Sequence, residues 1–200
     1  MAEEKTCEAT LQSMDFIAQH IKKVASNLDT KEVNNLVDGI IGAKRIFLMG
    51  AGRSGLVAKA FAMRLMHMGF NAYVVGESTT PAVHADDLVI AVSGSGETSS
   101  IARFGLIAKE DIGSKLATVT SNKDSKLGKI SDIVVVIPGR PKDDYGDYEK
   151  RRMIGYPQLA PLGTVFEISA LVFLDAVVSE LMVRTGASEA ELRSRHPVFE

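Results

Sequence analysis

The chain has 200 residues, 46% of them hydrophobic, and a formal net charge of -2. This length and composition suffice for one well-cored domain and hardly for two. The near-neutral charge excludes the broad basic surface that binding of nucleic acid or an anionic membrane requires, whereas a small anionic substrate needs only local positive potential.

The first residues are acidic, unlike a secretion signal, and no apolar run reaches the roughly 18 residues of a membrane span. The single cysteine, Cys7, cannot form an internal disulfide, which suits a reducing compartment. We therefore expect a soluble, cytoplasmic protein.

Two helices are predicted ahead of the first strand. The first spans residues 11–28, where apolar or small side chains recur at spacings of three and four, as in an amphipathic helix. The members of this seam are Leu11, Met14, Ala18, Ile21, Ala25 and Leu28. Such a seam usually packs on its own domain, and packing between subunits is the alternative. A second helix is predicted from Thr30, as its N-cap, to Gly42.

From residue 45 onward, short apolar strands alternate with helices. The strands are predicted at residues 45–49, 72–75, 88–92, 116–119 and 133–137. Helices are expected between them, one ending at His67 and one over residues 99–109. Because the strands are apolar without alternation, they imply a parallel sheet covered on both faces. The predicted fold is α/β: a five-stranded parallel sheet flanked by helices, in a flavodoxin- or Rossmann-like three-layer sandwich.

A single domain is expected, with N-terminal helices over residues 6–42, an α/β core over 44–185 and a C-terminal tail over 186–200. Within the core, the polar residues 138–161 are too many for an ordinary connection and indicate a functional or partly mobile loop. A helix over residues 164–183 is apolar nearly all round and is expected to be deeply buried. In the tail, Ser188 and Glu191 indicate a capping box.

Two turns rich in glycine and hydroxyl residues follow the first and third strands. Residues 50–55 read Gly-Ala-Gly-Arg-Ser-Gly, a G-x-G-x-x-G between strand and helix, and Glu77 lies about 20 residues further on, as in a dinucleotide fingerprint. Residues 93–100 read Ser-Gly-Ser-Gly-Glu-Thr-Ser-Ser and carry five hydroxyls. A dinucleotide fold has no evident use for this second turn, and neither turn carries the G-K-[ST] of a Walker loop.

Such turns are suited to binding phosphate. Glycines let backbone amides approach an anion, helix N-termini add their dipoles, and Ser and Thr hydroxyls donate to phosphate oxygens. Two of them at the carboxyl ends of parallel strands can converge on one compact phosphate ligand. The alternative is a pair of tight turns capped by their own hydroxyls. The predicted substrate-binding residues are Gly52, Arg53, Ser54, Ser93, Gly94, Ser95, Gly96, Glu97 and Thr98.

The motifs, taken in order along the chain, resemble the SIS (sugar isomerase) domain family and, within it, the 6-phospho-3-hexuloisomerase branch. The resemblance rests on residues 50–55, 76–81, 87–88, 93–98, 161–167 and 195–196. Arg53, where related arabinose 5-phosphate isomerases tend to carry Lys, and the run Pro-Leu-Gly-Thr-Val-Phe-Glu at 161–167 favour that branch. Asp86 departs from the pattern, which has glycine there.

The resemblance implies a homotetramer that interconverts D-arabino-hex-3-ulose 6-phosphate and D-fructose 6-phosphate, a step of the ribulose monophosphate route of formaldehyde fixation. One alternative is another SIS isomerase, acting on an aldose phosphate such as arabinose 5-phosphate. A second is a non-catalytic sugar-phosphate sensor, against which the lack of a helix-turn-helix extension speaks.

Moving a carbonyl from C3 to C2 requires a base for the C2 proton, stabilisation of an enediolate and return of a proton at C3, with no redox cofactor. A carboxylate can perform both transfers when partial burial favours its protonated form near neutral pH. Glu167 is the candidate base, because it follows the long loop, lies in the first turn of a buried helix and occupies the matching family position. Its alternative role is a capping box with Thr164, and Glu97 is the rival base.

His196 is the second predicted catalytic residue. The resemblance suggests that its tail enters a site, in its own or a neighbouring subunit, where the imidazole would move a proton between substrate oxygens. A surface position is the alternative. His20 and His67 are expected to pack in helices or lie on the surface. No metal site is predicted, because His84 and the two aspartates near it lack a further ligand.

Overall fold

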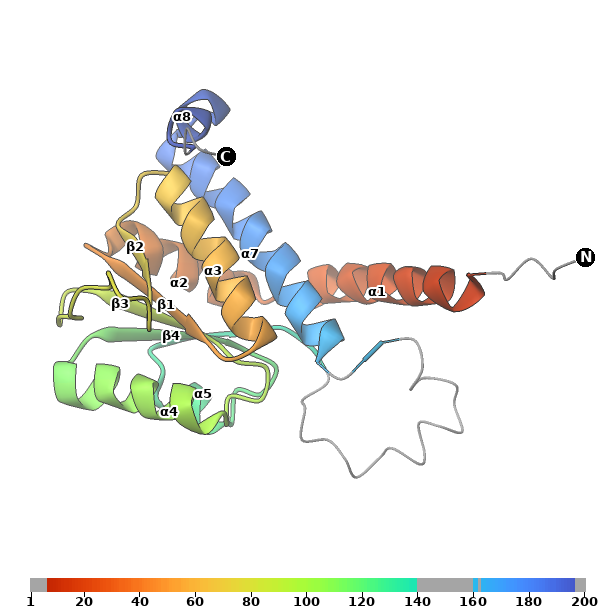
Figure 1. The fold of residues 1–200 in the computed structure, drawn as a ribbon, viewed down its shortest axis with the longest axis horizontal. Coiled ribbons are helices and arrows are strands. Elements are labelled where there is room, and N and C mark those ends of the chain that lie inside the picture. The colour runs from red at the N-terminus through yellow and green to blue at the C-terminus, as the bar shows by residue number, and fades with distance from the viewer. Residues whose placement is uncertain (1–6, 140–159, 162, 197–200) are drawn as a thin grey trace, which may run out of the picture.

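The computed structural model describes residues 7–139, 160, 161 and 163–196, so the predictions for residues 140–159 lie outside the described residues. Five strands form one parallel sheet in the order β2-β1-β3-β4-β5 (Figure 1). The strands are β1 (Ile46–Gly50), β2 (Ala72–Val74), β3 (Leu88–Val92), β4 (Lys115–Thr120) and β5 (Ile133–Val136). The predicted α/β class and the five-stranded parallel sheet are confirmed.

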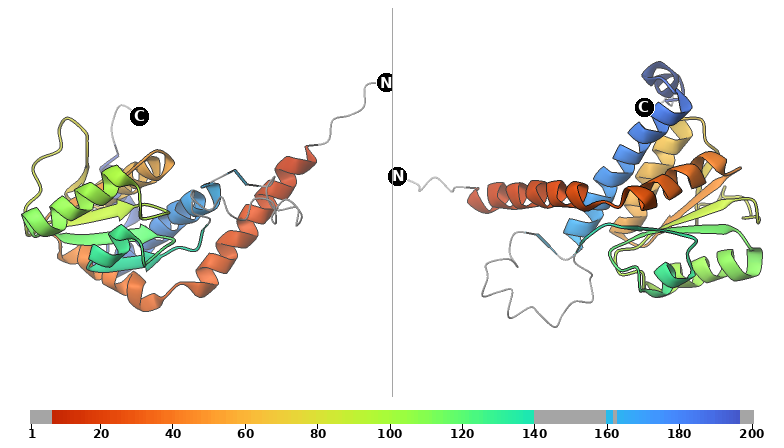
Figure 2. Two further views of the ribbon diagram at one scale, coloured as in Figure 1. Left: turned by 90° about the horizontal axis from the view of Figure 1, so that it is seen from below. Right: turned by 180° about the vertical axis from the view of Figure 1, so that it is seen from behind.

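Helices cover both faces of the sheet (Figures 1 and 2). They are α1 (Glu8–Asn27), α2 (Thr30–Gly42), α3 (Arg53–His67), α4 (Ser99–Leu106), the π-helical turn η1 (Ile107–Ile112), α5 (Lys126–Ile130), α7 (Thr164–Thr185) and α8 (Glu189–Ser194). α2, α3 and α7 pack on one face, and α4, η1 and α5 pack on the other. No helix among the residues that the structure describes has both the length and the apolar character to cross a bilayer.

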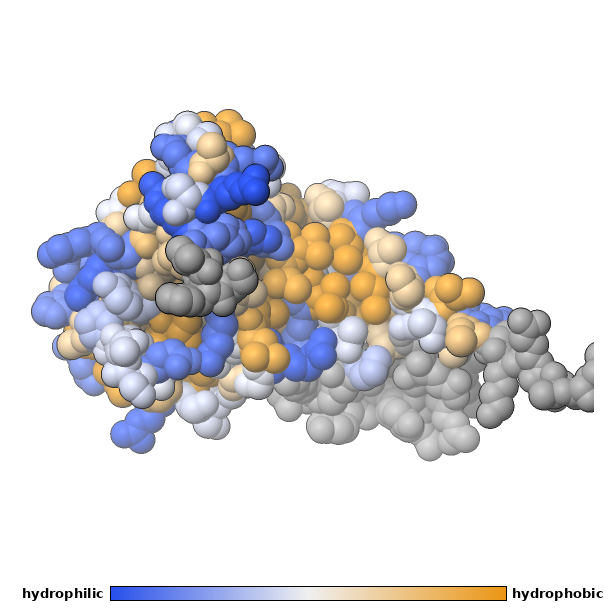
Figure 3. Space-filling model, turned by 45° about the horizontal axis from the view of Figure 1, so that its top comes forward, coloured by the Kyte–Doolittle hydropathy of each residue, from blue (hydrophilic) through white to orange (hydrophobic). Residues whose placement is uncertain are grey.

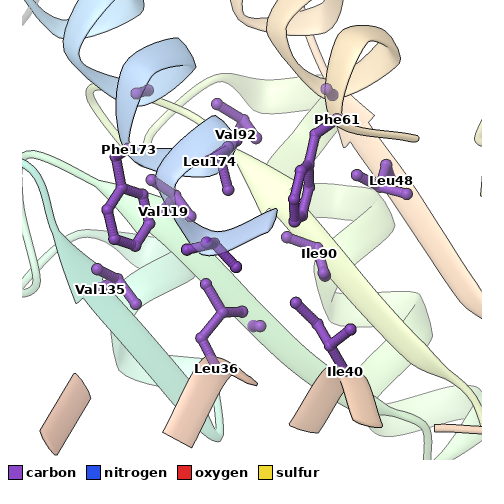
Figure 4. Close-up of a cluster of buried hydrophobic side chains, with 14 of the residues drawn as sticks. Leu36, Ile40, Leu48, Phe61, Ile90, Val92, Val119, Val135, Phe173 and Leu174 are labelled. Atoms are coloured by element: carbon purple, nitrogen blue, oxygen red, sulfur yellow. The ribbon is translucent and has the colours of Figure 1, made fainter. Parts of the chain in front are cut away.

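The strands contribute side chains to two separate cores. In β1, Ile46 and Leu48 belong to the core under α2, α3 and α7, whereas Phe47 and Met49 belong to the core under α4 and α5. Figure 4 shows the larger core, with Leu36, Ile40, Leu48, Phe61, Ile90, Val92, Val119, Val135, Phe173 and Leu174 labelled. Because side chains on both faces are buried, the strands lack the apolar and polar alternation of a half-exposed sheet.

Side-chain caps fix the first helix after α1 and the last helix of the chain. The N-cap of α2 is Asp29, because its carboxylate accepts the Lys31 amide at 2.8 Å, and the prediction of Thr30 as N-cap is wrong. The predicted capping box of Ser188 and Glu191 is confirmed at the start of α8, where each residue accepts the backbone amide of the other.

The second face of the sheet differs from the sequence prediction in two places. The helix predicted over residues 99–109 ends as α4 at Leu106 and continues as a π-helical turn. The sequence analysis missed α5, whose N-cap Ser125 accepts the Gly128 amide at 3.2 Å. A helix this short has no apolar period to detect, so its cap and its packing define it.

Two helices are less buried than predicted. In α1, Leu11 is 68% exposed and Met14 is 64% exposed, and Val24 is the buried residue. The N-terminal end of this helix stands clear of the sheet and the helices that cover it (Figures 1 and 2). The prediction that the α1 seam packs on its own domain is therefore wrong for its N-terminal half. α7 is buried on its inner side but leaves Val172 and Val183 exposed, so its predicted deep burial is only partly correct.

An ion pair links β1 and β3 at the amino edge of the sheet. Arg45 precedes β1 and Asp87 precedes β3, and their side chains share two hydrogen bonds, from Nε to Oδ1 at 2.9 Å and from Nη2 to Oδ2 at 2.6 Å. The buried Asp87 carboxylate also accepts the His84 amide at 2.7 Å. The hydrogen bond to Asp87 raises the pKa of Arg45 above its ordinary value. The pair therefore holds two neighbouring strands together as ionised groups.

Asp87→Ala should lower the free energy of unfolding by about 3 kcal/mol, because Arg45 and the His84 amide lose their shared buried partner. Urea unfolding followed by circular dichroism measures the change. Asp86→Ala is the matched control, since Asp86 forms an exposed ion pair with Lys44 at 3.0 Å, and exposed pairs contribute little to stability. Equal losses in the two variants would contradict the prediction.

Candidate active site

The two predicted loops meet at the carboxyl edge of the sheet. β1 and β3 are adjacent and parallel, so the loops that follow them, residues 50–55 and 93–98, emerge side by side. The strand order reverses at this point, and such a switch point is where open α/β sheets bind ligands. A pocket of about 230 Å³ lies here. It is lined by Ala51, Gly52, Ser54, Val92, Ser93, Gly94, Ser95, Thr98, Gly163, Phe166 and Glu167.

The first loop is tight because its glycines let the backbone approach itself. A Cβ atom on Gly55 would lie 2.7 Å from the Gly50 carbonyl oxygen, and Gly52 has a φ of 56°, in the left-handed region. α3 begins at Arg53, and Ser54 is buried in its first turn beside the pocket. The amides and the positive dipole end of α3 therefore lie at this wall of the pocket.

The second loop is held by hydrogen bonds within itself. The Gly96 amide donates to the carbonyl oxygen and to Oγ of Ser93, at 3.1 and 3.2 Å, and the Glu97 amide donates to Ser95 Oγ at 3.2 Å. Thr98 is the N-cap of α4, but its side chain makes no capping hydrogen bond. Ser93 and Ser95 thus act as acceptors inside the turn, while their hydroxyl hydrogens can still be donated to a ligand.

Glu167 forms the pocket wall at the start of α7. Its side chain is 2% exposed, and its Oε2 forms an ion pair with Nε of Arg53. The N-cap of α7 is Gly163, and no side chain caps the helix. The capping-box alternative, in which Glu167 bonds to Thr164, is therefore wrong. The guanidinium instead stabilises a negative charge on a carboxylate that water hardly reaches.

Arg53 lies on the outer side of Glu167 and not among the residues that line the pocket. Its side chain is 56% exposed. It borders a second, mainly apolar pocket of about 200 Å³ together with Leu56, Ile168 and Leu171. Glu167 lines both pockets, so the carboxylate stands between Arg53 and the two loops. A contact of Arg53 with substrate stays a prediction, whereas its contact with Glu167 is present.

Glu97 points away from the pocket although it belongs to the second loop. Its Oε1 accepts the Lys126 amide at 2.8 Å, and its Oε2 lies 3.0 Å from Lys126 Nζ. The amide hydrogen bond and then the ammonium group lower the pKa of Glu97 below its ordinary value. Glu97 thus anchors the N-terminus of α5 as a carboxylate, an arrangement that disfavours it as the base.

His196 lies at the opposite end of α3 from the pocket. Its ring stacks on the buried ring of His67 with centroids 4.0 Å apart, and Nη1 of Arg195 donates to the His67 carbonyl oxygen at 3.0 Å. α3 has 15 residues between Arg53 and His67, so the two ends are about 20 Å apart. Within one chain His196 is thus remote from Glu167, and a role in a neighbouring subunit stays a prediction.

The remaining histidines and Asp86 have structural contacts. His20 Nε2 lies 2.9 Å from the Pro138 carbonyl oxygen, which joins α1 to the end of β5. His84 bonds to Asp87 through its backbone, and Asp86 pairs with Lys44. Among the described residues, no group of three His, Cys, Asp or Glu side chains is placed to hold a metal ion.

The sequence analysis did not identify Phe166 as part of the site. A Cβ atom on Gly94 would lie 2.9 Å from Phe166 Cδ1, so the aromatic ring packs directly on the second loop. The signal was present, because Phe166 lies in the 161–167 motif next to Glu167. Its large apolar side chain read as part of the core, and it is also that.

The SIS domain model matches residues 39–148, which is more than half of the chain. An uncharacterized protein of Archaeoglobus fulgidus is 45% identical over 190 residues, which cover 95% of this chain and 100% of that one. The 3-hexulose-6-phosphate isomerase of Bacillus subtilis is 39% identical over 193 residues, which cover 95% of this chain and 100% of that one. The chain therefore belongs to the SIS domain family, as its motifs indicated.

Solved structures share the fold over nearly the whole chain. A Methanococcus jannaschii protein, for which the molecular function of 3-hexulose-6-phosphate isomerase was inferred, has 36% identity and a TM-score of 0.78, covering 94% of this chain and 99% of that one. An Escherichia coli CFT073 protein in complex with arabinose 5-phosphate has 25% identity and a TM-score of 0.74, covering 93% of this chain and 94% of that one.

Glu97 should titrate below pH 4.5, the ordinary value for glutamate, because Lys126 stabilises its ionised form. The stability that this contact contributes is present above pH 4.5 and is lost as the pH falls through the lowered pKa of the folded protein. NMR titration of the side-chain carboxyl carbon measures the pKa. Lys126→Ala keeps the backbone amide and should reverse only part of the shift, and a pKa of 4.5 or higher in the unaltered protein would contradict the prediction.

Proposed function

We propose that this protein is a 6-phospho-3-hexuloisomerase, which interconverts D-arabino-hex-3-ulose 6-phosphate and D-fructose 6-phosphate. The observation that carries the proposal is Glu167, a buried carboxylate at the wall of a pocket that two anion-binding loops form. The chain is an isomerase, because relatives of that name match nearly its whole length at 36–39% identity. The hexulose substrate is the finer part of the proposal.

The phosphate is proposed to bind between the two loops. Hydroxyls of Ser54, Ser93, Ser95 and Thr98 line that part of the pocket, and α3 and α4 both begin there. No lysine or arginine is among the described residues that line the pocket. Recognition would therefore rest on neutral donors and helix N-termini, which are sufficient to hold a phosphate.

Glu167 is proposed as the base. It takes the proton from C2 of the hex-3-ulose, the electrons of that bond form the C2=C3 double bond, and the carbonyl oxygen on C3 takes the negative charge. Protonated Glu167 then returns the proton to C3. The hydroxyl proton on O2 moves to O3 as the C2 carbonyl forms. Atoms and electrons balance without a redox cofactor, and one carboxylate performs both carbon proton transfers.

Arg53 and His196 have different places in this scheme. Arg53 is paired with Glu167 and would keep the carboxylate oriented toward the pocket. His196 fits the proton transfer from O2 to O3 only in the site of a neighbouring chain, because in its own chain it lies at the far end of α3.

The alternative isomerase acts on an aldose phosphate. The complex of the E. coli protein with arabinose 5-phosphate favours this alternative, but its 25% identity is lower than the 39% identity of the B. subtilis 3-hexulose-6-phosphate isomerase. Supplying each sugar phosphate separately and measuring fructose 6-phosphate distinguishes the two. A sensor without activity would convert neither substrate.

Glu167→Gln should lower kcat for hexulose 6-phosphate roughly a thousandfold, because the amide cannot accept the C2 proton. The Kd for fructose 6-phosphate should change little, since the loops stay in place. Solvent deuterium exchange at C2 checks the same step independently. Glu97→Gln is the matched control and should retain turnover, and near-normal turnover in Glu167→Gln would remove this residue as the base.

The protein is further proposed to form a homo-oligomer through an apolar face on α3 and α7. Leu56 and Met63 of α3 and Val172 of α7 are exposed, and Ile168 and Leu171 border the apolar pocket beside them. Figure 3 shows a hydrophobic area that runs from the body of the domain toward α1. The exposed apolar side chains of α1 offer a second surface of the same kind, so a second copy of this chain is the fitting partner.

Leu56→Glu should shift the mass in light scattering toward that of the 21.5 kDa monomer, because it places a charge in the apolar contact. Leu106→Glu is the matched control, since Leu106 is also exposed but lies at the end of α4, on the opposite face of the sheet. A monomeric wild-type protein, or equal effects of the two substitutions, would contradict the proposed assembly.

A further inference from the structure

The connection from β4 to α5, residues 120–126, lies behind the second loop. It does not line the pocket, yet it contacts the loop at successive residues. The Gly96 carbonyl oxygen accepts the Leu127 amide at 3.2 Å, and Glu97 bonds to Lys126. A Cβ atom on Gly96 would lie 2.0 Å from Ser125 Oγ. The connection therefore supports the second loop from the side opposite the pocket.

The strongest of these contacts is at Gly94, which lines the pocket. Its carbonyl oxygen accepts the Ser121 amide at 3.0 Å and the Ser121 hydroxyl at 2.6 Å. Thr120 Oγ1 donates to the same oxygen at 3.2 Å. The Phe166 ring packs against the Cα position of Gly94. The Gly94 peptide is thus fixed by donors at its oxygen and by an aromatic ring beside it.

Fixing this carbonyl also fixes the next amide. In a trans peptide the C=O and the following N–H point to opposite sides of the chain. The Gly94 oxygen faces Ser121, so the Ser95 N–H faces away from it. Within the described part of the chain, the Ser95 amide donates to no protein acceptor, and Ser95 lines the pocket.

We propose that Ser121 is a positioning residue for substrate phosphate: through the Gly94 carbonyl it aims the Ser95 amide at the anion. This inference rests on the proposed function for the identity of the substrate, but not for the binding of phosphate. Ser121 itself stays outside the pocket and touches no reacting atom. Its effect is therefore on affinity, and the chemical step at Glu167 does not depend on it.

The test compares Ser121→Ala with the wild-type protein. The substitution removes the hydroxyl donor but keeps the backbone hydrogen bond to Gly94, so the loop becomes less well fixed without being released. The Kd values for inorganic phosphate and for fructose 6-phosphate, measured by isothermal titration calorimetry, should rise roughly fivefold to tenfold. KM for hexulose 6-phosphate should rise by the same factor, and kcat should stay unchanged.

Two further variants separate positioning from a general loss of structure. Ser121→Thr keeps a hydroxyl at the same place and should restore most of the affinity. Ser131→Ala removes a serine hydroxyl that also donates to a backbone carbonyl, that of Leu127 at 2.7 Å, and should leave phosphate affinity unchanged. If Ser121→Ala fails to fold, Ser121→Cys takes its place, because a thiol is a weaker donor of similar size.

Unchanged phosphate affinity in the folded Ser121 variant would overturn the inference, whether or not the wild-type protein isomerises hexulose 6-phosphate. An equal loss of affinity in Ser131→Ala would overturn it as well, because the effect would then be structural. A wild-type protein that binds phosphate but converts no hexulose 6-phosphate would refute the proposed reaction alone, and the binding measurements would still decide the role of Ser121.

Discussion

The whole site depends on one constraint of parallel sheets: strands that lie side by side and run in the same direction end at the same edge. β1 and β3 are neighbours although β2 lies between them in the sequence. Their following loops therefore face each other across one pocket. Neither loop alone distinguishes a nucleotide from a sugar phosphate. Their adjacency produces a compact anion site, with two helix N-termini and several hydroxyls directed at one small volume.

Glu167 is placed in this anion site by the packing of α7 against α3. The carboxylate stands in the first turn of α7, and its ionic partner, Arg53, stands in the first turn of α3. The relative position of the two helices thus determines where the base lies with respect to the first loop. The second loop is fixed independently, from the other face of the sheet, by the connection between β4 and α5. Substrate binding and proton transfer are therefore supported by different parts of the fold.

Features that depend on local sequence could be predicted, and features that depend on distant contacts could not. The strand at residues 88–92 and the two glycine loops carry their signals within a few residues. Glu97 is a carboxylate in a phosphate-type loop, but its partner Lys126 is 29 residues away and turns it from the pocket. The same holds for α1, where the apolar seam is visible in the sequence but its exposure follows from the direction in which the helix leaves the domain.

The two edges of the sheet have separate tasks. At the amino edge, Arg45 and Asp87 join β1 to β3 through a buried ion pair. At the carboxyl edge, the same two strands lead into the loops that form the pocket. No described residue of the ion pair lines the pocket, so side chains around the ligand can be exchanged during evolution while this fastening of the scaffold is kept. A fold arranged in this way can acquire new sugar specificities one loop residue at a time without first losing its stability.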